Sequence, residues 1–476
     1  MEIFSKKGRF SLMDKRVENF LRSMNGKKVA FCGIGTSNLP LIKLFVKYGA
    51  VVTACDKGSR EKLGKNADLA EQYGAVLSLG EHYLDSTDYD IVFRTPGMKY
   101  YMPELVRMRE KGVVVTSEME VFFDLCPCKI YGITGSDGKT TTTTIISEML
   151  KQHGKTVHLG GNIGTPLLPL IETIDDNDVA VVELSSFQLI SMRKSPDVAV
   201  VTNLEPNHLD IHKDMQEYID AKKNLVLHQG AFSKVVLNQD NAITNSFADV
   251  CRGKILKFSR KGKVTNGTYL AENGDIVFVE NGRETTVLNK TDIKIPGMHN
   301  VENYMSAIAA VWDDVDIDDM VCVAKNFGGV EHRAEFVREL DGVKYYNDSI
   351  ASSPTRTARG TLSLYDRKII LIAGGYDKKI PYDGLGSVIV DKVKILILLG
   401  ATAPKIKTAV LNAANYKENN PVIIEVESME QAVQTARTLA VNGDIVSMSP
   451  ASASFDLYKN FAERGKHFKA IVNALQ

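Results

Sequence analysis

Short apolar runs, rich in β-branched residues, recur along the chain and mostly end in glycine or a small polar residue. They lie at 29–33, 51–56, 129–135, 179–186, 197–204, 368–375 and 394–400, and amphipathic stretches such as 141–153 separate several of them. Runs that are apolar throughout are typical of strands buried on both faces, so their alternation with helices predicts parallel sheets covered by helices. Ligands of such sheets bind beyond the carboxyl ends of the strands.

The length and the breaks in this pattern predict three domains. At about 150 residues per domain, 476 residues correspond to three. Breaks near Cys126-Pro127-Cys128 and near Phe327-Gly328-Gly329 predict domains at 1–127, 128–329 and 330–476. We expect an α/β protein with a Rossmann-like N-terminal domain, a central parallel sheet of the P-loop ATPase type and a Rossmann-like C-terminal domain. The stretch 253–291 reads as a β-rich insertion.

Charge and composition exclude several classes of protein. The 58 basic and 58 acidic side chains balance, which argues against a protein that wraps nucleic acid or coats an anionic membrane. The apolar runs are far too short to span a membrane, and the N-terminus lacks the apolar core of a secretory signal. Six scattered cysteines are too few for a disulfide framework. We therefore expect a cytoplasmic protein without membrane insertion or a nucleic-acid partner. We also expect a monomer, although neither charge nor composition determines the oligomeric state.

A nucleotide motif follows the first apolar run. Gly33-Ile34-Gly35-Thr36-Ser37-Asn38 precedes a predicted helix, and Asp56 ends the next apolar run. This resembles the dinucleotide fingerprint, although Asn38 occupies the place of the third glycine. Backbone amides at such a helix start could hold a diphosphate. The alternative is a tight turn that binds no ligand.

A second glycine-rich loop carries the stronger signal. The run Gly135-Ser136-Asp137-Gly138-Lys139-Thr140-Thr141 follows an apolar strand and precedes a helix. Glycines let backbone amides close on phosphates, the lysine can bridge the β and γ oxygens, and the Thr140 hydroxyl can reach Mg²⁺. The sequence therefore predicts an ATP site, even though Ile133 stands where the strict motif has its first glycine.

Three residues downstream have the chemistry of metal ligands. Glu183 and His208 each follow a predicted strand, and Lys222 lies in a predicted helix. Carboxylates and imidazoles at the carboxyl ends of strands can hold a metal beside a phosphate loop. Taken singly, each also has an ordinary structural interpretation: a cap or ion pair, a packed histidine and a solvated lysine.

Taken together, the motifs resemble those of the Mur ligases and folylpolyglutamate synthases. In the family's order, and covering about residues 29 to 468, the chain contains GITGSDGKTTTT, Gly160-Gly161-Asn162, ELSSFQL, Asn207-His208-Leu209-Asp210, Gly297-Met298-His299-Asn300-Val301-Glu302-Asn303, His332-Arg333, Asn347-Asp348-Ser349 and SPASASFD. The ELSSFQL and SPASASFD runs are most similar to those of members that add D-glutamate to UDP-N-acetylmuramoyl-L-alanine.

The resemblance implies an ATP-dependent ligase of peptidoglycan synthesis that works through an acyl phosphate. Lys139, Asn162, His208 and Lys222 would be catalytic, and two Mg²⁺ ions would be held by Thr140, Glu183, His208 and a carbamylated Lys222. ATP would be bound by Gly135, Ser136, Asp137, Gly138, Lys139, Thr140, Thr141, Asn300, Asn303, Arg333 and Asp348.

The same resemblance assigns the two other substrates. The nucleotide sugar would contact Gly35, Thr36, Ser37, Asp56, Thr95, Pro96 and Gly97. D-Glutamate would contact Lys378, Ser454, Phe455 and Phe461, with the start of a helix near Ser454 favouring one carboxylate. The chain departs from the family at Asp137, Thr95 and Ile350, where relatives carry asparagine, serine and, in many cases, lysine.

Two alternatives remain open. One is another amide-forming relative with a different amino acid or acceptor, against which the ELSSFQL and SPASASFD runs argue. The other is an oxidoreductase or nucleotide switch that uses the first fingerprint, which leaves the ATP loop, Glu183 and His208 unexplained.

Overall fold

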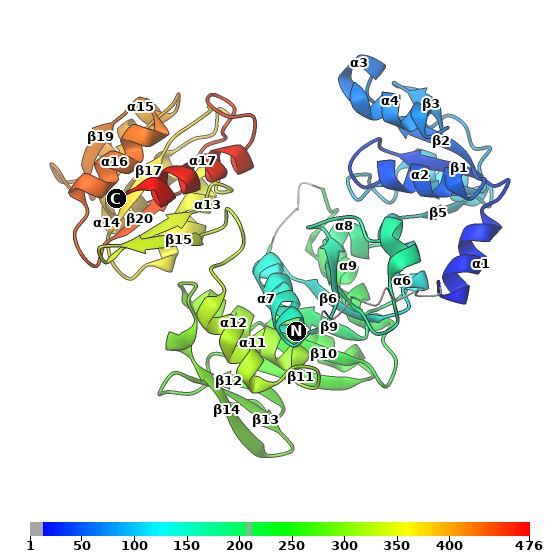
Figure 1. The fold of residues 1–476 in the computed structure, drawn as a ribbon, viewed down its shortest axis with the longest axis horizontal. Coiled ribbons are helices and arrows are strands. Elements are labelled where there is room, and N and C mark those ends of the chain that lie inside the picture. The colour runs from blue at the N-terminus through cyan, green and yellow to red at the C-terminus, as the bar shows by residue number, and fades with distance from the viewer. Residues whose placement is uncertain (1–12, 207–210) are drawn as a thin grey trace, which may run out of the picture. The chain divides into compact units, whose positions relative to one another are not determined.

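The computed structural model describes residues 13–206 and 211–476, which form three sheets (Figure 1). The chain divides into two compact units, one of residues 1–289 and 302–323, the other of residues 290–301 and 324–476. The first unit holds two of the sheets and the second unit holds the third. The α/β fold with three sheets is confirmed, whereas the domain limits at 127 and 329 stay predictions.

The first sheet has the strand order β3-β2-β1-β4-β5, and all its neighbours are parallel. Its strands are β1 (Lys28–Cys32), β2 (Val51–Asp56), β3 (Val76–Leu79), β4 (Ile91–Phe93) and β5 (Val114–Thr116). Its helices are α1 (Lys15–Ser23), α2 (Leu39–Lys47), α3 (Arg60–Leu63), α4 (Lys65–Gln72), α5 (Pro103–Glu110) and α6 (Glu118–Leu125). The order reverses between β1 and β4, and the loops after these two strands meet there.

The second sheet has the order β14-β13-β12-β11-β10-β9-β6-β8-β7. Its strands are β6 (Lys129–Thr134), β7 (Val157–Gly161), β8 (Val179–Glu183), β9 (Val198–Val201), β10 (Lys234–Asn238), β11 (Lys254–Ser259), β12 (Gly267–Leu270), β13 (Asp275–Glu280) and β14 (Arg283–Asn289). Its helices are α7 (Lys139–Gln152), α8 (Ser186–Leu189), α9 (Met215–Leu227), α10 (Ala242–Ser246), α11 (Met298–Val311) and α12 (Ile317–Asn326). Because β6 lies between β8 and β9, the loops that follow these three strands are neighbours.

Two expectations for this sheet need correction. It is mixed rather than parallel, since β12, β13 and β14 pair antiparallel. The stretch 253–291 is β-rich but extends the main sheet instead of forming a separate insertion. The turn Asn281-Gly282, with φ of 52° and 79°, explains the reversal, because two left-handed residues make the tight turn that joins antiparallel strands.

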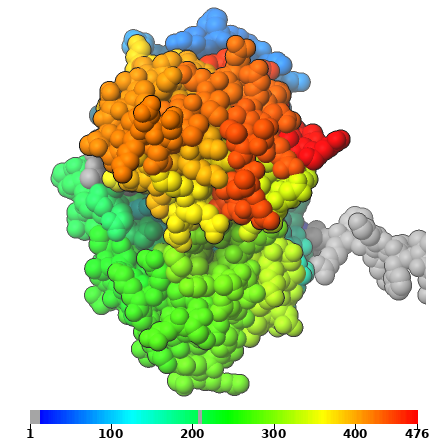
Figure 2. Space-filling view, turned by 90° about the vertical axis from the view of Figure 1, so that its left-hand side faces the viewer, coloured from blue at the N-terminus to red at the C-terminus, as the bar shows by residue number. Residues whose placement is uncertain are grey.

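The third sheet has the order β15-β16-β20-β17-β18-β19, parallel except for the β15–β16 pair. Its strands are β15 (Glu335–Leu340), β16 (Val343–Asn347), β17 (Ile369–Ala373), β18 (Val393–Leu398), β19 (Val422–Glu425) and β20 (Ile445–Met448). Its helices are α13 (Pro354–Arg356), α14 (Asp383–Lys392), α15 (Ala403–Leu411), α16 (Met429–Leu439) and α17 (Phe461–Ala474). In the space-filling view, the side chains of this C-terminal part (orange) form a continuous surface (Figure 2).

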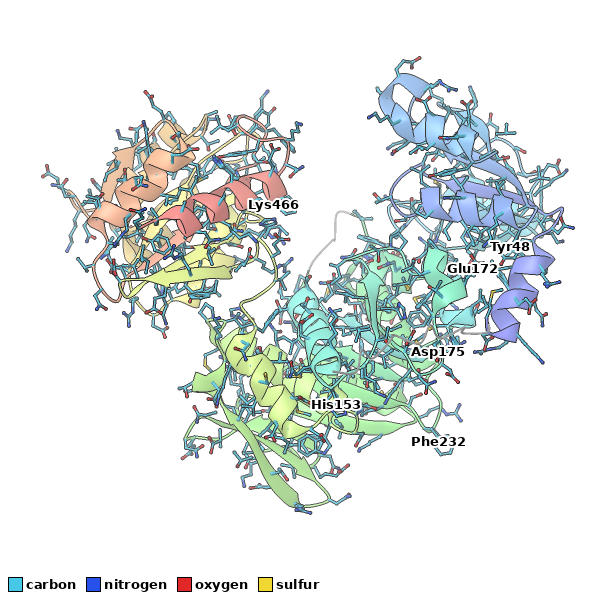
Figure 3. The ribbon with its side chains drawn as sticks, in the orientation of Figure 1. Tyr48, His153, Glu172, Asp175, Phe232 and Lys466 are labelled. Carbon is cyan, nitrogen blue, oxygen red and sulfur yellow. The ribbon has the colours of Figure 1, made fainter. Side chains whose placement is uncertain are left out.

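Contacts between α2 and residue Glu172 connect the first two sheets. The Tyr48 hydroxyl donates to Glu172 Oε1 at 2.6 Å and Lys47 Nζ donates to the same atom at 2.7 Å (Figure 3). The hydrogen bond to the Glu172 carboxylate raises the pKa of Tyr48 to about 12. The tyrosine therefore stays a hydrogen-bond donor across the neutral range.

Two further expectations concern cysteines and the membrane. All six cysteines are free thiols, and the buried Cys126 and Cys128 Sγ atoms lie 3.5 Å apart. Within the described residues no helix is both long and apolar enough to cross a lipid bilayer.

Candidate active site

The glycine-rich loop lies between β6 and α7, as the sequence predicts. Gly138 has a φ of 77°, and a Cβ atom there would collide with Asn303 Oδ1, so only glycine fits without strain. The loop is held from β9: Thr202 Oγ1 donates to the Asp137 carbonyl at 2.6 Å, and the Asp137 amide donates to Asn203 Oδ1 at 2.9 Å. The Asp137 side chain itself is exposed.

The lysine of the loop rests on its own backbone. Lys139 Nζ donates to the carbonyls of Gly135 and Ser136, both at 2.9 Å. Ser136 Oγ donates to the Glu205 carbonyl at 2.9 Å and lies 2.9 Å from the Tyr218 hydroxyl. The loop is therefore braced by its neighbours before any phosphate arrives.

Glu183 ends β8 beside this loop. Its side chain is almost fully buried, Oε1 accepts a hydrogen bond from Asn162 Nδ2 at 2.8 Å, and Oε2 is buried and finds no hydrogen-bond partner among the described residues. A buried carboxylate oxygen without a partner is costly. A cation beside Oε2 would remove that cost, so this donor fits a metal ion.

Lys222 projects from α9 into the same place. Only 2% of the residue is exposed, and Nζ donates to Thr134 Oγ1 at 3.1 Å and to the Gly135 carbonyl at 2.9 Å. Burial, aided by the charge of Lys139, holds the pKa of Lys222 well below its usual value. Its neighbour Lys223 lies instead over the Phe247 ring, 5.7 Å from the ring centroid. Lys222 is thus the lysine that reaches the phosphate loop.

Other predicted ATP residues are spread over both units. Asn303 Oδ1 accepts from Thr142 Oγ1 at 3.2 Å behind the loop, and Asn300 Nδ2 donates to the Pro296 carbonyl at 2.5 Å. The Asp348 carboxylate, directly after β16, accepts from Ser449 Oγ and the Ala334 amide, both at 3.2 Å. Burial raises the pKa of Asp348. His208 lies outside the described residues.

The nucleotide-sugar motifs meet at one pocket. It has a volume of about 300 Å³ and is lined by Thr36, Ser37, Asn38, Arg94, Thr95, Pro96, Ser117, Glu118, Met119, Gly161, Asn162, Ile163, Gly164, Pro166 and Gln188. The structure therefore brings four of the predicted sugar-binding residues together with Asn162. Gly35, Asp56 and Gly97 do not line it.

Asp56 and Asn38 shape the loop beside that pocket. Both carboxylate oxygens of Asp56 accept backbone amides, from Ile34 at 2.9 Å and from Gly58 at 2.8 Å. Asn38 Nδ2 donates to the carbonyls of Cys32 and Gly33, both at 3.0 Å. The asparagine that replaces the third glycine of the motif therefore fastens the turn, a role that the sequence did not reveal.

The predicted D-glutamate residues follow β17 and β20, which are adjacent strands. Lys378 is exposed, and its Nζ donates to the Ser352 carbonyl at 3.3 Å. Ser454 is buried, whereas Phe455 and Phe461 are 63% and 39% exposed. One expectation is wrong: no helix starts near Ser454, since α17 begins at Phe461 with Asn460 as its cap.

A buried arginine organises this part of the C-terminal domain. Arg464 donates through Nη1 to the Ala453 carbonyl at 3.0 Å, and through Nη2 to the Ser349 carbonyl at 2.9 Å and the Ser452 carbonyl at 3.1 Å. Burial lowers its pKa to about 10. Arg464 thereby ties the loop after β16 to the loop after β20, and its position within an amphipathic helix gave no signal of that role.

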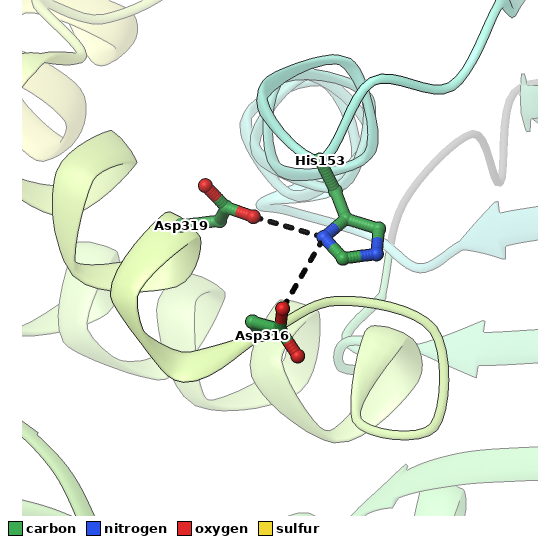
Figure 4. Close-up of side chains that lie close together, drawn as sticks. All are labelled: His153, Asp316 and Asp319. Carbon is green, nitrogen blue, oxygen red and sulfur yellow. Dashed lines mark hydrogen bonds and ion pairs between the residues drawn. The ribbon is translucent and has the colours of Figure 1, made fainter.

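A second group of metal-capable side chains lies at the far end of α7 from the phosphate loop (Figure 4). His153 Nδ1 lies 2.9 Å from Asp319 Oδ2 and 4.0 Å from Asp316 Oδ2. Asp319 is in the first turn of α12, where a carboxylate is favoured by the helix dipole. We interpret this group as an ion pair that joins two helix ends.

Comparison with known proteins shows which protein family the chain belongs to. Residues 133–311 match the Mur ligase middle domain, and residues 332–452 match the Mur ligase glutamate ligase domain. The chain belongs to the Mur ligase family, whose members are ATP-dependent ligases.

Individual relatives show which ligases of the family this chain is similar to. The chain is 53% identical over 467 residues, 98% of its length and all of the relative's, to the UDP-N-acetylmuramoylalanine–D-glutamate ligase of Acetivibrio thermocellus. It is 51% identical over 97% of its length, again with all of the relative covered, to the ligase of the same name from Clostridium botulinum. A solved UDP-N-acetylmuramate-alanine ligase from Thermotoga maritima shares the fold, with a TM-score of 0.55, 17% identity, and 94% and 99% of the two chains covered.

Replacement of Gly138 tests how tightly the phosphate loop is built. We expect Gly138→Ala to lower the free energy of unfolding by about 1–2 kcal/mol from left-handed strain alone, and to raise the KM for ATP because Asn303 must move. Gly154→Ala, at the other end of α7, is the control, since Gly154 has a φ of 85° but no atom within 4 Å of the added Cβ. Urea denaturation and ATP kinetics measure both effects. Equal kinetics for the two variants would contradict the expectation.

Proposed function

We propose that this chain joins D-glutamate to UDP-N-acetylmuramoyl-L-alanine, with ATP as the energy source, in the synthesis of peptidoglycan precursors. The observation that carries this proposal is the identity above 50% along the whole chain with ligases of that name. As a member of this family the chain is a cytoplasmic enzyme. The location of the site residues agrees with this proposal. The phosphate loop, the buried Glu183 carboxylate and the pocket lined by Thr36 and Thr95 all lie within one unit.

The chemistry requires that a poor electrophile be activated. A carboxylate oxygen of the alanyl group attacks the γ-phosphorus of ATP, and ADP leaves with the electron pair of the broken P–O bond. The amine of D-glutamate then attacks the carbonyl carbon of the acyl phosphate, loses a proton, and phosphate leaves. Two anions meet in the first step, so catalysis depends on cations and on positioning.

We assign ATP to the loop between β6 and α7. The amides of Gly135, Ser136, Asp137 and Gly138 would surround the phosphates, with the Thr140 and Thr141 hydroxyls at the helix start. Lys139 would turn from the Gly135 and Ser136 carbonyls to the β and γ oxygens. Asn300 and Asn303 would contact the nucleoside, while Arg333 and Asp348 would bind from the C-terminal domain.

We assign two Mg²⁺ ions to positions beside this phosphate loop. Thr140 and Glu183 would hold one; the buried Glu183 Oε2, which has no hydrogen-bond partner in the part of the chain that the structure describes, supports this. His208 and Lys222 would hold the other, provided that the Lys222 amine has added CO₂ to become a carbamate, since an ammonium cannot bind a cation. The chemistry that bound Mg²⁺ supplies is neutralisation of charge between phosphate and carboxylate. Asn162, through its bond to Glu183 Oε1, would orient that carboxylate.

We place the nucleotide sugar in the pocket lined by Thr36, Ser37, Thr95 and Pro96. Gly35, Asp56 and Gly97, which do not line this pocket, would contact the same substrate from the adjoining loops. D-Glutamate would bind at the loops after β17 and β20. Lys378 would pair with one carboxylate, Ser454 and the Phe455 backbone would hold the other, and Phe461 would form a wall.

A panel of amino acids tests the function. Phosphate release from ATP is measured with UDP-N-acetylmuramoyl-L-alanine and, in turn, D-glutamate, L-lysine and meso-diaminopimelate. We expect D-glutamate alone to stimulate release strongly. Stimulation by L-lysine or diaminopimelate, without an effect of D-glutamate, would point to another ligase of the family.

Lys378→Ala tests the amino-acid site. Loss of one charged hydrogen bond costs about 1.5–3 kcal/mol, so we expect the KM for D-glutamate to rise about tenfold to a hundredfold while the KM for ATP stays constant. Lys379→Ala is the matched control from the same loop. Steady-state kinetics with each substrate varied in turn measure both variants, and a larger effect at Lys379 would exchange the roles of the two lysines.

A further inference from the structure

Arg94 is a buried cation at the edge of the nucleotide-sugar pocket. It directly follows β4 and precedes Thr95-Pro96, which line the pocket, and only 2% of the residue is exposed. Among the described residues that line the pocket, Arg94 is the sole basic side chain, and none of the ion pairs of the described chain includes it. Burial lowers the pKa of Arg94, and the charge of Glu120 offsets only part of that effect. Burying a charge is costly, so the contacts that the guanidinium makes in return need an explanation.

The guanidinium crosses from the first sheet to the second. Nη2 donates to Ser191 Oγ at 2.7 Å and to the Phe187 carbonyl at 3.1 Å, at the end of α8. On the other side, the guanidinium carbon lies 5.5 Å from the centroid of the Tyr100 ring. Arg94 therefore fastens the loop that follows β4 to a helix of the central sheet.

Helix α8 is in turn close to the proposed metal ligand Glu183. It starts three residues after Glu183, and Gln188 in this helix lines the sugar pocket. The His212 ring stacks on Phe187 with the centroids 5.1 Å apart, and its Nε2 lies 2.8 Å from Ser186 Oγ. A displacement of α8 would thus reach both the sugar pocket and the strand end that carries Glu183.

We propose that Arg94 is a positioning residue for the nucleotide-sugar substrate: by locking the Thr95-Pro96 loop to α8, it sets where the bound nucleotide sugar lies relative to Glu183 and the phosphate loop. This inference rests on the proposed function. Arg94 need not touch the substrate, because it acts through the loop and the helix that it joins. Positioning within the proposed reaction is sensitive, since a shift of about 1 Å can cost about a hundredfold in rate.

The variants are Arg94→Lys, which keeps the charge but loses the planar guanidinium that bonds Phe187 and Ser191 through Nη2 and lies over Tyr100, and Ser191→Ala, which removes one acceptor. The matched control is Arg109→Lys. Arg109 lies 4.4 Å from the centroid of the same Tyr100 ring and donates to the Tyr100 carbonyl, but does not line the pocket. Binding of UDP-N-acetylmuramoyl-L-alanine is measured by calorimetry, and kcat and each KM by phosphate release.

We expect Arg94→Lys and, more weakly, Ser191→Ala to raise the Kd and KM for the nucleotide sugar about tenfold or more and to lower kcat, with the KM for ATP and the melting temperature close to wild type. Arg109→Lys should match wild type. Unchanged nucleotide-sugar binding in both variants, or an equal loss in Arg109→Lys, would overturn the inference while leaving the function intact. Wild-type protein that binds the nucleotide sugar but shows no D-glutamate-dependent phosphate release would instead overturn the proposed function.

Discussion

Lys222→Ala is expected to abolish ligation, with kcat lowered about a thousandfold or more, as for the loss of a group that stabilises transition-state charge. The amine is buried against the phosphate loop, 2.9 Å from the Gly135 carbonyl, where alanine offers neither a charge nor a carbamate. The measurement is phosphate release with saturating substrates. Added bicarbonate should not restore the variant, because no amine remains to react with CO₂.

Lys223→Ala is the matched control. Lys223 is half-buried over Phe247, and its replacement should leave kcat within about twofold, as for a surface substitution away from the site. In the wild-type enzyme, removal of dissolved CO₂ should lower activity and bicarbonate should restore it. Near-normal turnover of Lys222→Ala together with a large loss in Lys223→Ala would transfer the proposed role to Lys223.

Lys139→Ala is expected to lower kcat/KM for ATP about a thousandfold, because the phosphoryl transfer loses its cation at the β and γ oxygens. We expect the variant to fold, because Lys139 is half-exposed and the two loop carbonyls that accept from its Nζ can bind water instead. Nucleotide binding by calorimetry separates loss of affinity from loss of rate.

The control for this prediction is Lys151→Ala in the same helix. Lys151 pairs with Glu148 on the surface at 2.8 Å, and exposed pairs contribute little, so both kinetics and stability should stay near wild type. A Lys139→Ala enzyme with wild-type kcat/KM would remove the phosphate loop from the proposed mechanism.

The glycine loops were predictable from sequence because their chemistry is local. A loop between a buried strand and a helix needs glycine where the backbone is left-handed, as at Gly138, and a lysine one residue later. Strand order is not local information. The resemblance assigned Thr36 and Thr95 to one ligand, and in the structure both line one pocket beside the point where the strand order reverses; their role stays a prediction.

The missed roles depend on contacts that the residue type does not reveal: Asn38 bonds carbonyls five and six residues away, and Arg94 bonds a carbonyl 93 residues away. Both side chains donate to backbone carbonyls, and the residue type alone does not predict which carbonyl will accept. The sequence could not decide which of the neighbours Lys222 and Lys223 reaches the phosphate loop. The structure distinguishes them, because Lys222 is buried against that loop and Lys223 is not. We expected a helix to start near Ser454 because serine is a common helix cap. The helix begins later, and its cap is Asn460, whose side chain accepts from the Glu463 amide.

The resting position of Lys139 has a consequence for turnover. Its ammonium already donates to two carbonyls of the loop that it would leave for phosphate oxygens. Nucleotide binding is then an exchange of partners, and only the difference between the two sets of hydrogen bonds contributes to affinity. When ADP departs, the same carbonyls would accept from the lysine again. In the proposed reaction the loop would thus lower the free-energy cost of emptying the site and favour product release in every cycle.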